Sequence, residues 1–396
     1  MNAGKWMLDI AMAGLLAAVA GPGADKTTAA ARPSLRWKNG PGNILSQAPR
    51  FYGGAEAARI ARTVLLFQRS SGGWPKNRDM IRPLTDQAAA ALRNRKNRTD
   101  TTFDNGATHT QARFLARVYN ATKDRRCRDA VLRAVDFMLK AQYANGGWPQ
   151  FFPLRGGYSD HITFNDNAMI GVMTALREVA EDPKTYAFVD EDRREKAVAA
   201  LRKGIDCILR CQIVVNGRRT AWCAQHDQRT LAPRKARSYE LPSISGSESV
   251  GIVRFLMSIE EPSSEIVKAV QGAVAWFDRA KLTGIRQVTE PDKSRPRGFD
   301  KIVVKDPTAP PMWARFYRIG TNKPIFCGRD GVPKDTLAEI SYERRTGYSW
   351  LGYYPTNLLA KDYPAWQKKC APKRNVLKRN EKAPRQVTSH PVGGRG

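Results

Sequence analysis

Residues Gln68-Arg-Ser-Ser-Gly-Gly-Trp-Pro75 recur further along the chain as Gln142-Tyr-Ala-Asn-Gly-Gly-Trp-Pro149. A degraded third copy runs from Gln212 through Gly217 to Trp222. Apolar residues at helical spacing precede each copy, so each copy predicts the end of a helix. The glycine pair ends the helix because glycine adopts left-handed geometry without penalty, and the proline prevents a restart. The apolar positions are Ala57, Ile60, Ala61, Val64 and Leu65, then Val131, Ala134, Val135 and Met138, then Val198, Leu201, Ile205 and Ile208.

A second helix is predicted after each of these stops. Its entry repeats the pattern [ST]-x-x-[DE] in the segments 101–104, 163–166 and 245–248, which is typical of a helix N-terminus. Apolar helical stretches follow at 112–119, 169–179 and 250–259, and a further amphipathic helix carries Val267, Val270, Val274 and Phe277. Helical hairpins that cannot bury their own faces must stack. The sequence therefore predicts a mostly α protein, an (α/α) toroid of repeated helical hairpins.

The pattern changes between Asp306 and Pro355. Short aromatic and β-branched runs alternate there with turn residues such as Gly320-Thr-Asn322 and Gly328-Arg-Asp-Gly331. This composition indicates strands and long loops. We expect this loop- and β-rich C-terminal segment to close over one end of the ring.

The two ends of the chain differ in composition from the body. Residues 1–24 predict a signal peptide, with Lys5, an apolar run and a small-residue cleavage site at Ala18-Val19-Ala20, although Asp9 within the run also fits a buried N-terminal helix. We expect residues 25–50 to form a linker, residues 51–365 the toroid domain, and residues 366–396 a basic flexible tail. Secretion or delivery to the periplasm is expected.

The net charge of +29 points to an anionic partner. No apolar stretch is long enough to span a bilayer, so stable membrane insertion is not expected. A nucleic-acid-binding protein would explain the charge, because phosphate contacts come from Lys and Arg. The export signal and the acidic residues at the predicted opening argue against nucleic acid as a partner. We expect a monomer.

Other common kinds of site find little support. The six cysteines are too sparse for a disulfide scaffold, and Cys207 and Cys211 lack the second close pair of a structural zinc site. No G-x-S-x-G elbow or phosphate-binding loop occurs. His109 falls inside a predicted helix, where a structural role is the default.

Asp104, Asp166 and Glu248 are the acidic residues of the three repeated helix entries. Each is explained by helix capping alone. In a toroid, however, equivalent helix starts point toward one opening, where converging carboxylates need a cation. Asp and Asn oxygens suit Ca²⁺, so the pairs Asp104-Asn105 and Asp166-Asn167 are candidate calcium ligands.

Basic residues crowd the loops near this predicted opening. They are Arg234, Lys235 and Arg237, and further along Arg315, Arg318, Lys323 and Arg329. Calcium together with arginines suits a polymer of carboxylates, since guanidinium groups bind carboxylates bidentately. Any one of these arginines also fits a solvated surface position. Trp74 and Trp148 fit either stacking on sugar rings or plugging the end of a hairpin.

Several motifs between about Ala55 and Pro355 resemble the pectate lyases of polysaccharide lyase family ten. That family has an (α/α) toroid fold and cleaves polygalacturonate by calcium-dependent β-elimination. The motifs are GGWPKN at 72–77, TFDNGATHTQ at 102–111, GGWPQFFP at 146–153, TFNDNAM at 163–169, ARSYELPSISGSES at 236–249 and RFYRIGTNKPIFCGRDG at 315–331.

The resemblance implies roles for individual residues. Asp166 would ligate calcium, and Asp104 would lie at the same site as a ligand or a substrate-orienting group. Arg237 would be the base, with Arg234 as the nearby alternative. Arg315 and Arg329 would bind galacturonate.

The implied chemistry is consistent with these residue types. β-Elimination removes the proton at C5, next to the uronate carboxylate, and a divalent ion on that carboxylate stabilises the developing charge. An arginine is normally protonated, and we expect surrounding cations to lower the pKa of the catalytic arginine. The enzyme alternative is a uronan hydrolase that uses Asp104 and Asp166 as a carboxyl pair.

Overall fold

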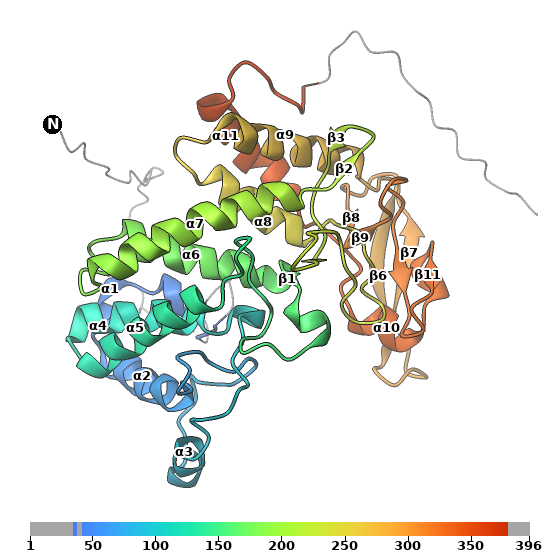
Figure 1. Cartoon of the computed structure of the whole chain (residues 1–396). Coiled ribbons are helices and arrows are strands. Elements are labelled where there is room, and N and C mark those ends of the chain that lie inside the picture. The colour runs from blue at the N-terminus through green and yellow to red at the C-terminus, as the bar shows by residue number, and fades with distance from the viewer. Residues whose placement is uncertain (1–34, 38–41, 379–396) are drawn as a thin grey trace, which may run out of the picture.

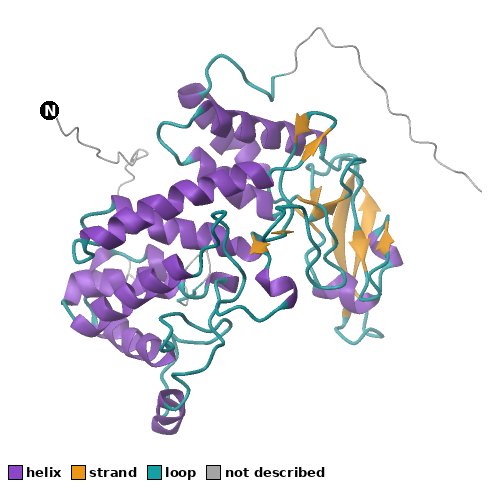
Figure 2. Ribbon diagram, viewed as in Figure 1, coloured by secondary structure: helices purple, strands orange, loops and turns teal. Residues whose placement is uncertain are grey.

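The computed structural model describes residues 35–37 and 42–378, and helices are its main secondary structure. The helices stack on one side of the molecule, and most of the strands gather on the other (Figures 1 and 2). The helices are α1 (Pro49–Tyr52), α2 (Ala55–Phe67), α3 (Asp86–Arg93), α4 (His109–Thr122), α5 (Arg125–Lys140), α6 (Ala168–Glu181), α7 (Glu191–Cys211), α8 (Glu248–Met257), α9 (Ser264–Arg279), α10 (Tyr342–Gly347) and α11 (Tyr363–Cys370).

The long helices form two layers. Helices α2, α5, α7 and α9 lie side by side in chain order as the outer layer, while α4, α6 and α8 form the inner layer. Each inner helix packs against the outer helix that follows it, giving the hairpins α4–α5, α6–α7 and α8–α9. Inner helix α6 is apolar around most of its surface, whereas outer helix α7 has a charged face for solvent. The predicted (α/α) toroid of repeated hairpins is confirmed.

A tryptophan plugs the end of each repeated outer helix. The indole Nε1–H of Trp74 donates to the carbonyl of Val64 (2.8 Å), that of Trp148 to Met138 (2.8 Å) and that of Trp222 to Ile208 (2.7 Å). All three rings are fully buried. The last carbonyls of a helix have no partner within the helix. The indoles of Trp148 and Trp222 each satisfy one such carbonyl, whereas the Val64 carbonyl that Trp74 reaches also accepts from the Gln68 amide (3.2 Å). Trp74 and Trp148 therefore plug the ends of hairpins, which is one of the two roles that the sequence left open for them.

A glutamine beside each tryptophan links neighbouring outer helices. Its side-chain amide donates to a carbonyl within its own turn and to a carbonyl of the next outer helix, at 2.8–3.0 Å. The three sets are Gln68 with Gly72 and Ala130, Gln142 with Gly146 and Ala200, and Gln212 with Thr220 and Ala269. The repeated glutamine therefore sets the spacing of the outer layer.

The strands are short, with one exception. Antiparallel pairs join β1 (Ile162–Thr163) to β4 (Gln225–His226), β2 (Val214–Val215) to β3 (Arg218–Arg219), β5 (Ile244–Ser245) to β9 (Phe316–Tyr317), β8 (Trp313–Ala314) to β12 (Leu351–Gly352), and β10 (Phe326–Cys327) to β11 (Pro333–Lys334). The long hairpin pairs β6 (Ile285–Pro291) with β7 (Phe299–Lys305). The sequence predicted that the strand-rich segment starts at residue 306, but this hairpin already starts at residue 285. The predicted boundary was therefore wrong. The β-branched run Ile302-Val-Val304 is the signal that was missed.

Both predicted ends of the folded region were set too narrowly. Within the predicted linker, Ile44 is fully buried and its carbonyl accepts from Tyr52 Oη (3.0 Å). Within the predicted tail, α11 continues to Cys370 because Trp366 is buried on the core. The segment after α11 still contacts the helical layers, since Gln271 Nε2 of α9 donates to the carbonyl of Arg374 (3.2 Å). The predicted signal peptide and residues 379–396 lie outside the described residues.

In the described part of the chain, no helix has the length and apolar content needed to cross a bilayer. The six cysteines are all free, and five of them are buried.

The tryptophan plug predicts a specific cost for losing one hydrogen bond. Trp148→Phe should lower the free energy of unfolding by about 1–3 kcal/mol, because it leaves the Met138 carbonyl without a partner in the core. Trp366→Phe is the matched control, since its ring is also buried but its Nε1 has no partner. Urea unfolding of both variants measures the difference. Equal losses would mean that ring volume, and not the hydrogen bond, determines the cost.

Candidate active site

Three acidic residues meet where the inner layer begins. Asp104 lies in the 3₁₀ turn Asp104–Gly106 before α4, Asp166 in the turn Asn165–Asn167 before α6, and Glu248 at the first residue of α8. The two turns contact each other, and the second also contacts α8. The repeat therefore gathers the three carboxylates at one end of the inner layer, as its periodicity predicts.

None of the three predicted capping boxes forms. Helix α8 begins after Ser247, and the backbone amide of Ser245, which a capping box would direct to Glu248, donates to the Trp222 carbonyl (2.7 Å). Ser245 Oγ accepts from the amide of Glu248 (3.0 Å) and donates to its carboxylate. Thr101 and Thr163 instead donate to the carbonyls of Phe152 and His161. The capping interpretation of Asp104 and Asp166 was wrong, because a 3₁₀ turn separates each threonine from the following helix.

The structural repeat is shifted by one residue relative to the pairs that the sequence suggested. Phe103 and Phe164 precede the two turns, so Asp104 is equivalent to Asn165, and Asn105 to Asp166. Asp104 is buried, whereas the Asp166 side chain is 41% exposed. Asn105 and Asp166 both adopt left-handed geometry, with φ of 52° and 50°. Non-glycine residues are rarely held in this region, and those that are cluster at functional sites.

The three carboxylates differ in their cationic partners. Lys76 Nζ donates to Asp104, and Arg315 Nη2 donates to Glu248. Among the described residues, Asp166 accepts only from the side-chain amide of Asn165 (2.8 Å), and its nearest cation is Arg315 at 4.0 Å. Asp166 is thus the one carboxylate of the three that has no close cation and reaches solvent.

The pKa of Asp166 reflects this imbalance. Partial burial raises it, the negative charges of Asp104 and Glu248 raise it further, and Arg315 only partly offsets them. Ionised Asp166 is therefore destabilised in the folded protein until a cation arrives.

The residues that surround Asp166 fit a calcium ion only in part. Within the described ranges, no three His, Cys, Asp or Glu side chains gather closely enough to hold a metal ion. Asn105 Nδ2 donates to Asn77 (3.1 Å), and the Asn167 amide lies against Gly251 of α8, where an added Cβ would meet Asn167 Oδ1 at 2.0 Å. The unsatisfied charge of Asp166 suits a hard cation, but other oxygens must complete its coordination shell.

Arginines and aromatic rings form one wall of the site. The guanidinium groups of Arg315 and Arg237 both lie over the ring of Tyr348, at 4.8 and 5.7 Å from its centroid. Tyr348 Oη donates to Glu240 (2.7 Å), and Arg237 Nε donates to the same carboxylate (2.7 Å). Arg237 is therefore connected to the Asp166 cluster through Tyr348 and Arg315.

The charge on Glu240 acts against the expected behaviour of Arg237. Burial alone would lower the pKa of Arg237, but the hydrogen bonds and charge of Glu240 outweigh burial and raise it. The expectation that calcium and other cations lower this pKa does not hold for the described residues by themselves, because the closest charge is a carboxylate.

The other two candidate arginines lie further out. Arg329 pairs with Glu343 (3.0 Å) and lies 5.9 Å from the Tyr239 ring centroid, beside Arg237. Arg234 pairs with Asp227 (3.3 Å) and is 55% exposed. Of the two neighbouring arginines, only Arg237 contacts Tyr348 and so joins the wall of the site.

Lys76, Glu240 and Tyr348 were not singled out from the sequence. Lys76 and Glu240 lie within the GGWPKN and SYEL segments, so the motifs contained them. Tyr348 follows a short helix near the end of the chain, and no local pattern marks it.

The comparisons with known proteins agree with this geometry. Residues 68–359 match the model of the family described as pectic acid lyase. The fold is similar to that of a family 10 polysaccharide lyase from Cellvibrio cellulosa, with 39% identity, 81% of this chain and 94% of that chain covered, and a TM-score of 0.68. A second structure is an aspartate-to-alanine mutant of the Cellvibrio cellulosa family 10 lyase in complex with trigalacturonic acid, with 38% identity, 82% and 96% coverage, and a TM-score of 0.68. No sequence among the curated proteins matches the chain.

The raised pKa of Asp166 predicts a pH-dependent stability difference. Its folded pKa lies above its unfolded value, so the ionised form destabilises the folded state at neutral pH and the penalty disappears as acid protonates it. Asp166→Asn should therefore raise the melting temperature at pH 7 in chelator and have little effect below the unfolded pKa of about 3.9. Asp206→Asn, which removes only an exposed pair with Arg210, is the control. A lower melting temperature for Asp166→Asn at pH 7 would contradict the proposed repulsion.

Proposed function

The chain belongs to the pectic acid lyase family and is a polysaccharide lyase, and we propose that it cleaves α-1,4-polygalacturonate by calcium-dependent β-elimination to give 4,5-unsaturated oligogalacturonides. The observation that carries the proposal is the exposed carboxylate of Asp166 beside the arginines stacked on Tyr348. The trigalacturonic acid bound to the mutant Cellvibrio lyase supports the substrate class.

The charge pattern suits an acidic polymer. Arg315 and Arg237 present guanidinium groups that bind uronate carboxylates through charge-assisted hydrogen bonds. Arg315 is held firmly, since Glu248 accepts from Nη2 while Tyr348 lies under the guanidinium plane. Arg315 Nε is buried without a partner, and any group that reaches it would gain a strong donor. In our proposal Arg329, at the outer edge, contacts a neighbouring galacturonate.

Calcium is proposed to bind at Asp166, with Asp104 near the same position. Bound calcium would neutralise the uronate carboxylate and so acidify the adjacent C5–H. For Asp104 to contribute directly, Lys76 must leave it, because Lys76 Nζ now donates to its carboxylate. Without that movement, Asp104 orients Lys76 beside the substrate. Asn105 and Asn167 are proposed as additional amide ligands.

The elimination itself needs a base for the C5 proton. As that proton leaves, its electron pair forms the C4–C5 double bond, the C4–O4 bond breaks, and O4 takes a proton from water or a nearby acid. We propose Arg237 as the base. Glu240 raises the pKa of Arg237 in the free protein, so Arg237 is protonated there. Substrate binding must separate the guanidinium from this carboxylate, and the guanidinium must release a proton to water, before Arg237 can accept the proton from C5.

A hydrolytic function is the second candidate, and one observation favours it. The raised pKa of Asp166 is the property that a general acid needs. Its partner Asp104, however, accepts from Lys76 and is buried, which leaves little access for a water molecule. We therefore favour elimination.

We also propose export from the cytoplasm and a monomeric state.

The product formed from polygalacturonate distinguishes the two reactions. Elimination should give a rise in ultraviolet absorbance, because the new double bond is conjugated with the carboxylate, and chelator should abolish it. Asp166→Ala should lose most of this activity and regain part of it at raised calcium, while Asp206→Ala should behave as the parent. Reducing ends without absorbance would support hydrolysis, and full activity in chelator would rule out calcium.

The assignment of the base predicts a contrast between two neighbouring arginines. Arg237→Ala should lower kcat by about 100-fold or more, the usual contribution of a general base, while trigalacturonate affinity is largely kept. Arg237→Lys should not restore turnover, because a lysine cannot present the planar fork. Arg234→Ala is the control and should stay near the parental rate.

Glu240→Gln tests the same assignment through the pH profile. Removing the negative charge should lower the pKa of Arg237, so the rise of kcat/KM with pH should move to lower pH. An unshifted profile, or an inactive Arg234→Ala variant, would show that Arg237 is not the base.

A further inference from the structure

The third repeat carries an insertion that the first two lack. Six positions separate the glutamine from the tryptophan in the first and second turns, but ten separate Gln212 from Trp222. The extra residues form the β2–β3 hairpin, whose tip is Asn216-Gly217 with φ of 50° and 71°. The third turn therefore projects from the molecule as a small hairpin.

This hairpin does not close against the next outer helix as the other turns do. A Cβ on Gly72 would come within 2.3 Å of the Arg133 carbonyl oxygen, and one on Gly146 within 2.0 Å of that of Lys203. A Cβ on Gly217 would meet nothing within 4 Å. The hairpin approaches α9 only lower down, where Arg219 lies against Gly272. The insertion thus leaves a cavity between the hairpin tip and α9.

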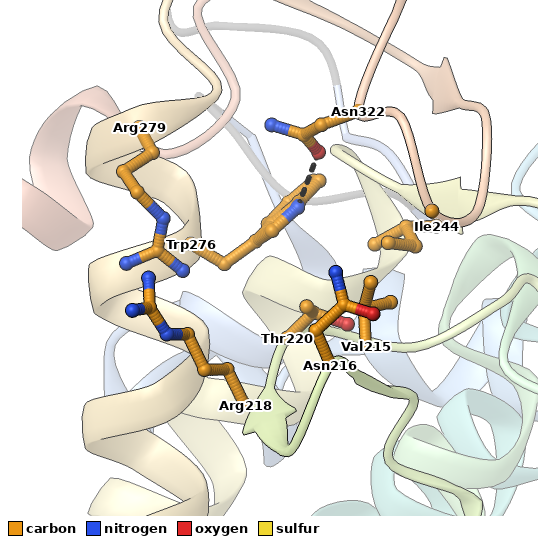
Figure 3. Close-up of a pocket in the computed structure, with 9 residues that line it drawn as sticks. Val215, Asn216, Arg218, Thr220, Ile244, Trp276, Arg279 and Asn322 are labelled. Atoms are coloured by element: carbon orange, nitrogen blue, oxygen red, sulfur yellow. Dashed lines mark hydrogen bonds between the residues drawn. The ribbon is translucent and has the colours of Figure 1, made fainter. Parts of the chain in front are cut away.

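Two arginines face each other in this cavity, which has a volume of about 390 Å³ (Figure 3). Arg218 comes from β3 and Arg279 from the last turn of α9, and their guanidinium groups point toward each other (Figure 3). Among the described residues, neither forms an ion pair, although the neighbouring Arg219 pairs with Glu265 (2.7 Å). Partial burial and the charge of Arg218 both lower the pKa of Arg279. The charge of Asp278 raises the pKa of Arg279 and so offsets only part of this effect, which leaves the repulsion between the two cations incompletely neutralised within the described residues.

A neutral donor completes the cavity. Trp276 Nε1 donates to Asn322 Oδ1 (2.6 Å), as Figure 3 shows. This bond fixes the orientation of the Asn322 side-chain amide, whose nitrogen can donate to an acceptor in the cavity. Asn216 lines the same cavity. Two guanidinium groups and an oriented amide are the donors that an oxyanion requires.

A second hollow continues from the first. Its volume is about 560 Å³, and it shares Arg218 and Arg279 with the first cavity. Arg374 adds further positive charge to its walls, whereas Lys268 and Arg219, which also line it, share a salt bridge with Glu265 (2.7 Å each). The two hollows together form an extended basic surface, with the arginine pair at its middle. This shape suits a chain of repeated anionic groups better than a single small anion.

This surface is distinct from the candidate active site. Ile244 lines the first cavity, whereas the next residue, Ser245, donates to Glu248. Successive side chains of a strand point to opposite faces, so the cavity and the carboxylate cluster lie on opposite sides of the β5–β9 pair.

We propose that the arginine cavity, formed around Arg218 and Arg279, is a second polyuronate-binding site that holds the polymer outside the catalytic cleft. The identity of the polymer rests on the proposed function. Each guanidinium binds one carboxylate of the polymer by donating hydrogen bonds to it, and the bound carboxylates offset the repulsion between the two arginines. The site raises the local concentration of polymer near the catalytic cleft without taking part in the chemistry.

The test compares two double variants of the full chain. Arg218→Ala/Arg279→Ala removes the arginine pair, and Arg62→Ala/Arg202→Ala removes two exposed arginines of α2 and α7 that line neither hollow. Polygalacturonate binding is measured in chelator, so that calcium-dependent turnover does not interfere. The first variant should bind polymer about tenfold more weakly than the parent, as expected for lost charge-assisted hydrogen bonds. The control should bind as the parent, and melting temperatures should agree.

Kinetics separate this proposal from the proposed function. With calcium, the first variant should show a raised KM for polygalacturonate and an unchanged kcat/KM for trigalacturonate, which is too short to use both sites. If the parent cleaves no polygalacturonate, the proposed function fails, yet loss of binding in the first variant alone would still support the cavity. Equal binding by parent and first variant, equal losses in both variants, or equally tight arginine-dependent binding of heparin would overturn the proposal.

Discussion

A tryptophan and a glutamine at the ends of the outer helices α2, α5 and α7 hold successive hairpins together. The indole satisfies a terminal carbonyl of its own helix, and the glutamine amide reaches a carbonyl of the next outer helix. Both bonds lie in or near the core, where an unpaired carbonyl is costly. Because the same two bonds recur three times, successive hairpins keep the same spacing and direction. The starts of the inner helices then meet at one end of the toroid.

The chemistry of the site follows from that convergence. Three carboxylates close together repel one another, and Lys76 and Arg315 neutralise only Asp104 and Glu248. Asp166 is left with a raised pKa, a left-handed backbone and access to solvent. This combination suits a carboxylate that binds a cation. The equivalent Asn105 shares the left-handed backbone but carries no charge.

The strand-rich segment completes the site from the other side. Tyr348 lies under both Arg237 and Arg315 and donates to Glu240, so residues from distant parts of the chain form one wall. Glu240 fixes the position of Arg237 but also keeps it protonated. In the free protein, positioning and basicity are therefore in conflict, and bound substrate has to relieve this conflict if Arg237 is the base.

The sequence by itself determined the repeat, the helical hairpins and the place of the acidic residues at the helix entries, because these depend on local spacing and on glycine and proline geometry. The capping pattern misjudged the register of Asp104 and Asp166, although the phenylalanines before the two turns, Phe103 and Phe164, already align Asp104 with Asn165 in the sequence. Only the tertiary structure decided that Lys76 pairs with Asp104, that Tyr348 joins two arginines and that Glu240 raises the pKa of Arg237. The first two are contacts between residues far apart in the chain, which leave no local pattern in the sequence. Arg237 and Glu240 lie only three residues apart, but that the carboxylate outweighs burial depends on the folded environment.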